Sequence, residues 1–300
     1  MPCYHPLRGY RAKSVNRDTG KRGIVFKRQA GFVDQPVDIP CGQCVGCRLE
    51  HSRQWAMRCK HEASLWEDNS FITLTYNDEN LPEGGTLVVK HWQDFMKRLR
   101  FHFAPRTIRF YHCGEYGSKT LRPHYHACLF NLSFQDQKFY SVKNEYRLYT
   151  SKTLENIWGM GFCTVGTVTF ESAAYCARYM MKKVKGKDAE EHYTRIDPDT
   201  GEIFQVLPEY ATMSRRPGIG KGWFDKYKDE TYKHDSVIID GKEVRPPKFY
   251  DSQLEAEHLE HIKFRRIARA KKHADDQTIA RLRVREEVKE AQISNLDRGL

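Results

Sequence analysis

Two histidines stand one residue apart in LRPHYHACLF, the segment from residue 121 to residue 130. Alternate side chains of a β-strand point to the same face, so a strand here would place His124 and His126 together and Tyr125 on the opposite face. Neighbouring imidazoles are suitable ligands for a divalent metal. The alternative is a half-buried strand whose polar face carries histidines without a binding role, because a His-x-His pattern alone has low specificity.

A carboxylate in the preceding segment can complete such a site. Glu115 lies in RTIRFYHCGEY, and a hairpin would bring it opposite His124 or His126 on the same face. Two imidazoles and one carboxylate leave coordination positions free for water and a phosphate, which is typical of a catalytic metal site. An ordinary carboxylate at the end of a hairpin is the alternative interpretation of Glu115.

Two tyrosines lie four residues apart in AAYCARYMMKK, residues 173–183. Helical periodicity places Tyr175 and Tyr179 on one side of a helix. Lys182 lies on the same side, and Lys183 lies at its edge. The opposite side carries Ala173, Ala177, Met180 and Val184. Cβ atoms at this spacing are about 5–6 Å apart, so both phenol groups could reach one small site. Packing or exposed aromatic residues are the alternative.

Together these groups suit the transesterification of a phosphodiester. A metal held by His124, His126 and Glu115 would polarise the phosphate and neutralise developing charge. A tyrosine would attack as its phenolate, and Lys182 or Lys183 would favour that phenolate or bind the phosphate. A phosphotyrosine link keeps the energy of the ester, so a cut strand can later be rejoined.

The elements expected to position these residues alternate between strands and helices. Strands are predicted at residues 71–76, 106–116, 123–130 and 163–170, and helices at residues 48–66, 92–103, 153–158 and 171–184. The fold class is therefore α+β, with a central antiparallel sheet flanked by helices. Four segments are expected: a Cys-rich segment with its leading helix at 1–67, a catalytic core at 68–185, a basic region at 186–250 and a long charged C-terminal helix at 251–300. After Pro247 the chain has no further proline and only Gly299 as glycine, which favours that helix.

The charge of the chain favours a polyanionic partner. Lysine and arginine number 50 against 39 acidic residues, which gives a net charge of +11. Arg215, Arg216 and Lys221 lie among glycines and could contact a DNA backbone; a solvated basic loop is nearly as good an interpretation. No run of eighteen apolar residues occurs, so no membrane span is expected.

Nine cysteines in a chain that begins without a secretory signal are expected to be reduced. CGQCVGC places Cys41, Cys44 and Cys47 at two-residue intervals, a spacing that suits structural Zn²⁺. Cys3 is included in the expected set, with His5 or Cys59 as other candidates for the fourth ligand. Free thiols are the alternative. Core packing is predicted for Cys113, Cys128, Cys163 and Cys176.

Three ordered segments resemble the motifs of the HUH endonuclease superfamily, namely FITLTYN, RPHYHACLF and AAYCARYMMKK. The two-tyrosine form is typical of the replication initiators of the Microviridae. The flanking segments PCGQCVGCRLEHSRQWAMRC, GEYGSKTLRPHYH and SRRPGIGKGWF resemble the gokushovirus branch. The resemblance covers roughly residues 1 to 230.

This resemblance implies an origin-specific endonuclease that uses Mg²⁺ or Mn²⁺ in the host cell cytoplasm. His124 and His126 correspond to the metal ligands of the family, and Tyr175 and Tyr179 to its paired nucleophiles; the third ligand varies among relatives. The enzyme would nick the replicative form at the viral DNA origin, remain linked to the 5′ phosphate and later recircularise the displaced strand. A host polymerase would extend the free 3′ hydroxyl. Because no GxxxxGK[ST] phosphate loop occurs, unwinding would depend on a host helicase.

Two other functions account for part of the same pattern. A zinc-stabilised nucleic-acid-binding protein without catalysis would explain the charge and CGQCVGC, but not the paired histidines and tyrosines. A metal-dependent hydrolytic nuclease would need no tyrosine nucleophile.

Overall fold

The computed structural model describes residues 3–18, 20–117, 120–143, 145–179, 183–184, 186, 188–196 and 200–297 of the 300-residue chain. The chain forms two compact units, which are Met1–His51 with Lys263–Leu300, and Ser52–Ile262. The first unit holds β1 (Leu7–Ala12), β2 (Ile24–Val25), β3 (Gly31–Ile39) and the start of α1 (Val45–Ala63). In it, β1 pairs with both β2 and β3 in antiparallel fashion.

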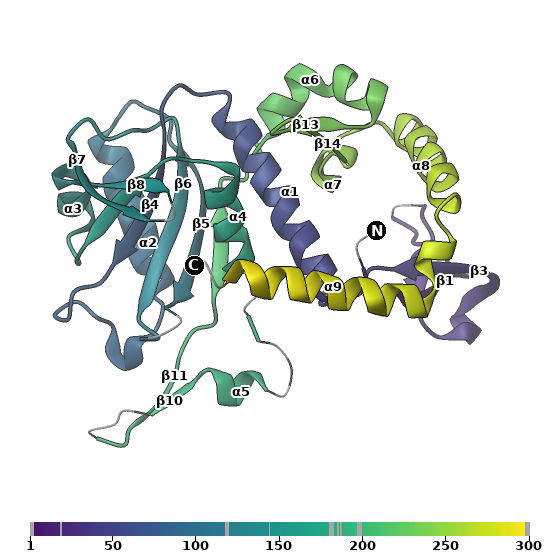
Figure 1. Cartoon of the computed structure of the whole chain (residues 1–300), viewed down its shortest axis with the longest axis horizontal. Helices are drawn as coiled ribbons and strands as arrows, with labels where there is room; N and C mark the ends of the chain where they lie inside the picture. The colour runs from purple at the N-terminus through teal and green to yellow at the C-terminus, as the bar shows by residue number, and fades with distance from the viewer. Residues whose placement is uncertain are drawn as a thin grey trace. The chain divides into compact units, whose positions relative to one another are not determined.

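A seven-stranded sheet organises the second unit, in the order β12-β5-β6-β4-β9-β8-β7 (Figure 1). The strands are β12 (Tyr210–Met213), β5 (Arg109–Tyr116), β6 (Pro123–Phe130), β4 (Asn69–Thr75), β9 (Cys163–Gly166), β8 (Tyr146–Ser151) and β7 (Gln137–Lys143). Every neighbouring pair is antiparallel. This arrangement confirms the predicted α+β class with a central antiparallel sheet.

Each face of the sheet has its own apolar core. One face packs against α2 (Val89–His102), whose stripe of Trp92, Phe95, Met96 and Leu99 is buried as its spacing predicts, and against α3 (Lys152–Trp158). The other face packs against α4 (Phe170–Tyr179) and the second half of α1. The buried residues that the two helices contribute to this core are small: Ala56 and Cys59 of α1, and Ala173, Cys176 and Ala177 of α4. Cys113, Cys128, Cys163 and Cys176 are all buried, as predicted.

The strand expected at residues 163–170 ends early. β9 stops at Gly166, and α4 begins at Phe170. A reciprocal pair of hydrogen bonds explains the switch, because the backbone N–H of Thr169 donates to Ser172 Oγ (2.8 Å) and that of Ser172 donates to Thr169 Oγ1 (3.1 Å). Such a pair satisfies the free N–H groups at the start of a helix. The described part of α4 ends at Tyr179, and Met180–Lys182 lie outside the described residues.

The charged C-terminal region is helical, as predicted, but it consists of two helices. α8 (Ala256–Lys271) and α9 (Ile279–Asp297) are separated by the short 3₁₀ helix η3 (Asp275–Gln277). Thr278 caps the N-terminus of α9, since its hydroxyl accepts a hydrogen bond from the backbone N–H of Arg281 at 3.4 Å. None of the helices in the described part of the chain combines the length and the apolar character that a membrane crossing requires.

The first unit also contains η1 (Arg28–Ala30). The remaining elements of the second unit are η2 (Glu83–Gly85), α5 (Ala189–His192), β10 (Thr194–Ile196), β11 (Ile203–Gln205), α6 (Lys221–His234), β13 (Val237–Ile239), β14 (Lys242–Val244) and α7 (Lys248–Asp251). Aromatic residues of α6 and α7, including Phe224, Tyr232 and Tyr250, form a further small core.

Candidate active site

The β5–β6 hairpin sets the register of the site. Glu115 pairs directly with His124 across the two strands, and Cys113 pairs with His126. The hairpin register assumed from the sequence is therefore present. Because side chains alternate along each strand, Glu115, His124 and His126 share the face that packs against α4.

A single carboxylate oxygen lies between the two imidazoles. Oε1 of Glu115 is 2.8 Å from Nε2 of His124 and 2.8 Å from Nε2 of His126. One ligand atom from each of the three residues lies within 4.8 Å of the others, so the group could hold a metal ion. Glu115 is 1% exposed and His126 is 6% exposed, which means that these groups are held by the protein interior rather than by solvent.

The far sides of both imidazoles are also fixed. Nδ1 of His124 lies 3.0 Å from the backbone carbonyl of Arg122, and Nδ1 of His126 lies 2.9 Å from the hydroxyl of Thr73. A carbonyl can only accept, so His124 donates from Nδ1. Nε2, which contacts Glu115 here, is then the nitrogen that would bind a metal once it carries no proton. Thr73 was missed in the sequence analysis. Its signal was its place in FITLTY on β4, the strand that pairs with β6.

An unpartnered oxygen indicates that the group fits a cation. Oε2 of Glu115 is buried and has no hydrogen-bond partner among the described residues. A buried carboxylate oxygen without a partner is costly, and a divalent cation would satisfy it. Two imidazole nitrogens and one carboxylate are common ligands of Mn²⁺ and related divalent metals.

Contacts within the group shift the pKa values of Glu115 and His126. Burial raises the pKa of Glu115, but the hydrogen bonds and charges of His124 and His126 outweigh burial and lower it below its ordinary value. Burial lowers the pKa of His126, with an opposing contribution from Glu115. An ionised carboxylate and a neutral imidazole are the states that coordinate a cation.

Tyr175 reaches this group from α4. Its hydroxyl donates to Oε1 of Glu115 at 3.4 Å, and its ring stands edge-on to His126 with 5.0 Å between ring centroids. Phe71 supports the ring from β4 at 6.4 Å. The buried face of α4 is formed by Ala173, Cys176 and Ala177, so Tyr175 turns toward the cluster rather than into the core.

The other predicted site residues of this helix are described only in part. Tyr179 is the last described residue of α4 and lies one turn beyond Tyr175, but its side chain lies outside the described part. Lys182 lies entirely outside the described residues. Lys183, which was expected on the same helix, is partly buried and lies outside α4. The roles of all these residues as nucleophiles or phosphate ligands stay predictions.

Hydrogen bonds with the side chains of Glu62 and Arg109 hold the backbone of the basic loop before α6. The N–H of Gly220 donates to Glu62 Oε2 (2.7 Å), and Arg109 pairs with Oε1 of the same carboxylate (2.6 Å) while donating to the carbonyl of Pro217 (2.9 Å). Arg215 and Arg216 of this loop are exposed. Lys221 instead begins α6 and forms an ion pair with Asp225.

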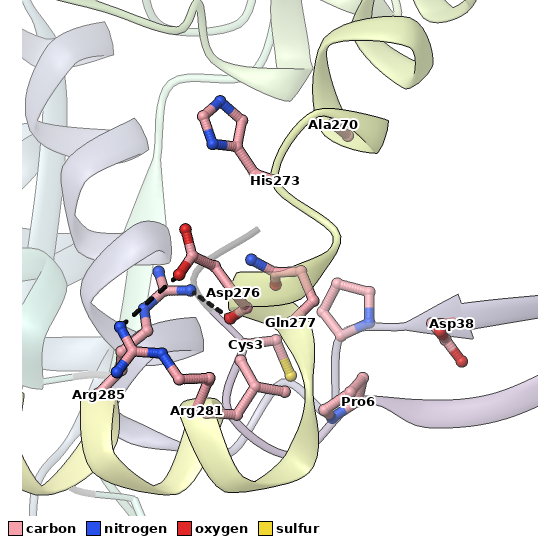
Figure 2. Close-up of a pocket in the computed structure, with 11 residues that line it drawn as sticks. Cys3, Pro6, Asp38, Ala270, His273, Asp276, Gln277, Arg281 and Arg285 are labelled. Carbon is pink, nitrogen blue, oxygen red and sulfur yellow. Dashed lines mark hydrogen bonds and ion pairs between the residues drawn. The ribbon is translucent and has the colours of Figure 1, made fainter.

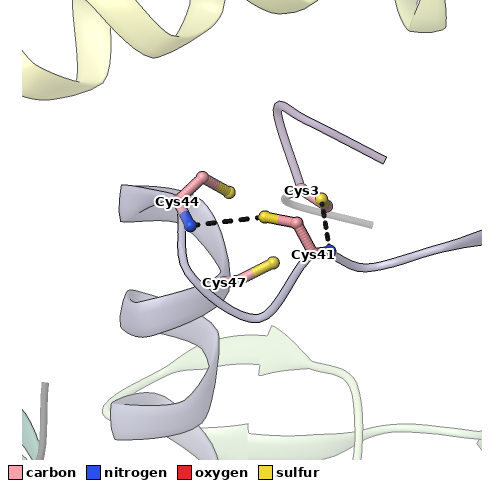
Figure 3. Close-up of side chains that lie close together, drawn as sticks. All are labelled: Cys3, Cys41, Cys44 and Cys47. Atoms are coloured by element: carbon pink, nitrogen blue, oxygen red, sulfur yellow. Dashed lines mark hydrogen bonds between the residues drawn. The ribbon is translucent and has the colours of Figure 1, made fainter. Parts of the chain in front are cut away.

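The Cys-rich segment brings together Cys3, Cys41, Cys44 and Cys47, whose sulfur atoms all lie within 4.8 Å of one another (Figure 3). The other two candidates for a fourth ligand lie elsewhere. His5 is bonded to Glu286 through Nε2 at 2.6 Å, and Cys59 is fully buried in the core of the second unit.

The chain is similar to known replication-associated proteins. A family model described as Replication-associated protein ORF2/G2P matches residues 69–184, which contain α4 and every strand of the seven-stranded sheet except β12. Replication-associated protein ORF2 of Spiroplasma virus 4 is 38% identical over 295 residues, covering 91% of this chain and 88% of that protein. Replication-associated protein VP4 of Bdellovibrio phage phiMH2K is 31% identical over 270 residues, covering 87% and 79%. Replication-associated protein ORF4 of Chlamydia phage 1 is 27% identical over 226 residues, covering 72% and 53%. No solved structure matches the chain significantly.

Proposed function

Because the chain belongs to the gokushovirus-like replication-associated proteins of the Microviridae, we propose that it initiates rolling-circle replication by nicking the viral replicative-form DNA at its origin. The observation that carries this proposal is the position of the Tyr175 hydroxyl, 3.4 Å from the carboxylate that also contacts His124 and His126. A phenol beside a set of metal ligands is the arrangement that phosphoryl transfer to tyrosine requires.

In the proposed reaction, His124, His126 and Glu115 hold a divalent cation, Mg²⁺ or Mn²⁺. Bound there, the cation would polarise the scissile phosphate and neutralise the charge that develops on it. The oxygen of Tyr175 or Tyr179 bonds to phosphorus as its phenolic proton is released. The bond from phosphorus to the 3′ oxygen breaks, and that oxygen leaves as a 3′ hydroxyl.

The resulting phosphotyrosine link makes the reaction reversible. A 3′ hydroxyl can attack the same phosphorus, release the tyrosine and restore a phosphodiester. Two tyrosines permit two successive transfers, because one can hold the first 5′ end while the other cuts the regenerated origin. Four residues of helix, about 6 Å along the axis, separate them, so both can serve one set of metal ligands. Lys183 and Lys182 follow on the same segment and would bind the phosphate or favour the phenolate.

The partners of this function follow from its chemistry. Arg215 and Arg216 project from a loop whose backbone is fixed by Glu62 and Arg109, which suits contacts to the phosphates of single-stranded or melted origin DNA. In the host cell cytoplasm, a host polymerase would extend the 3′ hydroxyl and a host helicase would open the duplex.

A covalent adduct is the decisive product. The full chain is incubated with a single-stranded origin oligonucleotide labelled at its 3′ end and Mg²⁺ or Mn²⁺, and the mixture is resolved on a denaturing gel. We expect a labelled protein–DNA species that forms only with the metal and carries the fragment on the 3′ side of the nick. Binding without cleavage would support a non-catalytic DNA-binding protein, and cleavage without an adduct would support hydrolysis by water.

A further inference from the structure

The four cysteines of the first unit have the geometry of a closed metal site. Their sulfur atoms lie within 4.8 Å of one another, and Cys3 is almost completely buried. Zn–S bonds of about 2.3 Å would place the sulfur atoms of a tetrahedral site about 3.8 Å apart. A contraction of less than about 1 Å between the most distant sulfur atoms would therefore complete the tetrahedron.

Backbone N–H groups point at these sulfur atoms. Cys41 N–H donates to the sulfur of Cys3 (3.3 Å), Cys44 N–H donates to that of Cys41 (3.3 Å), and Tyr4 N–H donates to that of Cys44 (3.4 Å). Hydrogen bonds of this kind stabilise a thiolate, which is the form that binds a metal. They give no comparable advantage to a disulfide sulfur, so the network favours a metal over two disulfides.

The local backbone explains how the thiols converge. Gly42 adopts a left-handed conformation (φ +76°), which other residues rarely adopt, and this turn directs the N–H of Cys44 back to Cys41. α1 then begins at Val45, so Cys44 and Cys47 lie at its first turn, where unpaired N–H groups and the helix dipole favour negative charge.

The site closes the open end of a hairpin. β1 begins at Leu7, which pairs with Ile39 near the end of β3. Cys3 precedes this pair and Cys41 follows it, while Cys44 and Cys47 belong to the start of α1. A bond from each sulfur to one metal ion would fasten both ends of the β1–β3 hairpin to the helix.

The first unit has too little apolar packing to hold this arrangement by itself. Its buried apolar side chains, among its described residues, are Cys3, Tyr4, Tyr10, Ala12 and Leu282. Large apolar residues such as Phe26 and Phe264 are 59% and 73% exposed. Units with so small a core usually need a metal or disulfides to fold.

A cavity beside Cys3 supports the same conclusion. It has a volume of about 760 Å³ and is lined by the N-terminal segment and by residues of α8 and α9 of the same unit (Figure 2). Pro6, Leu282 and Arg285 contribute to its wall. Side chains therefore leave space unfilled on this side of Cys3, and a metal bond would add a restraint that packing there does not supply.

We propose that Cys3, Cys41, Cys44 and Cys47 together bind one structural Zn²⁺ that fastens the β1–β3 hairpin to the start of α1. All four positions of the tetrahedron are filled by sulfur, which leaves none for water or substrate. The ion is separate in ligands and role from the divalent cation of the catalytic proposal.

Metal analysis of the purified full chain tests the site directly. Protein prepared under reducing conditions without chelators should contain one tightly bound zinc ion, released when an organomercurial titrates its thiols. Replacement of that zinc by Co²⁺ should produce the near-ultraviolet absorption of cobalt–thiolate bonds. Wild-type protein without bound zinc and without this absorption would overturn the proposal, as would a mass lower by two hydrogens for each pair of cysteines, which indicates disulfides.

Matched variants identify the ligands. Cys44→Ser should reduce the cobalt–thiolate absorption by at least about a quarter, because one of the four thiolates is removed. His5→Ala and Cys59→Ala, which alter the other two candidates, should leave it at full strength. His126→Ala should keep it as well, because it alters only the catalytic group.

If Cys44→Ser fails to fold, chelation of the wild-type protein replaces it. Amide hydrogen exchange should then accelerate at least about tenfold in β1 and β3 and remain unchanged in β5 and β6; unchanged exchange in β1 and β3 would contradict a structural role.

Discussion

The phenolic oxygen of Tyr175 lies 3.4 Å from Oε1 of Glu115, an oxygen that also lies 2.8 Å from an imidazole nitrogen of both His124 and His126. The four groups come from three elements: β5, β6 and α4. Two features bring these groups to one oxygen atom. The strand register pairs Glu115 with His124, and the capping interaction between Thr169 and Ser172 starts α4 at Phe170. A one-residue slip in the hairpin would turn Glu115 to the other face.

Removal of both phenolic hydroxyls should abolish the covalent adduct. In the double variant Tyr175→Phe/Tyr179→Phe we expect the rate of adduct formation to fall by at least about 10³-fold, because no nucleophile remains. The phenyl ring that replaces the phenol of Tyr175 can keep the contacts with His126 and Phe71, so the fold should persist. Each single variant should still form an adduct but fail to cut a regenerated origin while the first 5′ end is still bound, because that second cut requires the other tyrosine.

The assay is the denaturing gel with labelled origin oligonucleotide. Tyr140→Phe is the matched control, because Tyr140 is 55% exposed on β7. An adduct that persists in the double variant would refute the nucleophile assignment.

Thr73 should affect the affinity for the catalytic metal without taking part in the chemistry. Thr73→Val preserves the shape of the side chain but removes the hydrogen bond to Nδ1 of His126. Loss of such a partner typically weakens metal binding by about 10–100-fold. A Mn²⁺ titration of the nicking rate should show this shift, with the rate recovering at saturating metal.

Direct ligands should behave differently in the same titration. Glu115→Gln and His126→Ala should lose metal-dependent nicking at every concentration and still bind the oligonucleotide. Thr150→Val on β8 serves as the control for the threonine change. If Thr73→Val reaches half of its maximal nicking rate at the same Mn²⁺ concentration as the wild type, the hydrogen bond does not orient the imidazole.

The strands that carry the metal ligands could be predicted because they are determined by sequence patterns within two neighbouring segments. Alternation along 106–116 and 123–130 fixes which side chains share a face, and the short connection makes a hairpin the simplest pairing. The register then follows, with Glu115 opposite His124. The buried stripe of α2 was equally evident, since its period of 3.6 residues matches one helix face.

Features that depend on distant or competing contacts could not be predicted. CTVGTVTF favours a strand by composition, yet the paired bonds of Thr169 and Ser172 start a helix within it. Three residues competed for the fourth place in the Cys-rich cluster, and only the fold brings Cys3 beside the other thiols. Likewise, the pairing of Glu62 with Arg109 joins α1 to β5, and spacing alone gives no sign of it.

Arg215 and Arg216 should contribute to DNA affinity independently of sequence. In Arg215→Ala/Arg216→Ala we expect weaker binding to any single-stranded oligonucleotide. The slope of log affinity against log salt should fall by about 1.4 in magnitude if two phosphate contacts are lost, at about 0.7 for each contact. Fluorescence anisotropy at several salt concentrations measures both quantities.

A control with the same change in charge separates a local contact from a general effect. Lys97→Ala/Lys152→Ala removes two cations whose side chains are 74% and 78% exposed on α2 and α3. This variant should lose much less affinity than the loop variant. Equal losses in the two variants would indicate that net charge, rather than the loop, governs binding.

His61 should make the stability of the second unit sensitive to acid. Its ring stacks on Trp223 with 3.6 Å between centroids, and its Nδ1 lies 2.8 Å from the hydroxyl of Tyr250. Burial, with a smaller contribution from the charge of Lys60, lowers the pKa of His61 to about 3. In the unfolded chain its pKa is about 6.5, so between these values the unfolded state binds a proton that the folded state does not.

The free energy of unfolding should therefore fall as the pH drops below about 6.5, by up to about 1.4 kcal/mol per pH unit from this residue. At pH 5 the loss from His61 amounts to about 2 kcal/mol relative to pH 7. His61→Phe keeps an aromatic ring beside Trp223 but cannot be protonated. Its free energy of unfolding should therefore fall by about 2 kcal/mol less than that of the wild type between pH 7 and pH 5. Chemical denaturation at pH 7, 6 and 5 measures the difference, with the exposed His234→Phe as control. Parallel pH profiles for wild type and His61→Phe would mean that the imidazole is protonated equally in the folded and unfolded chains.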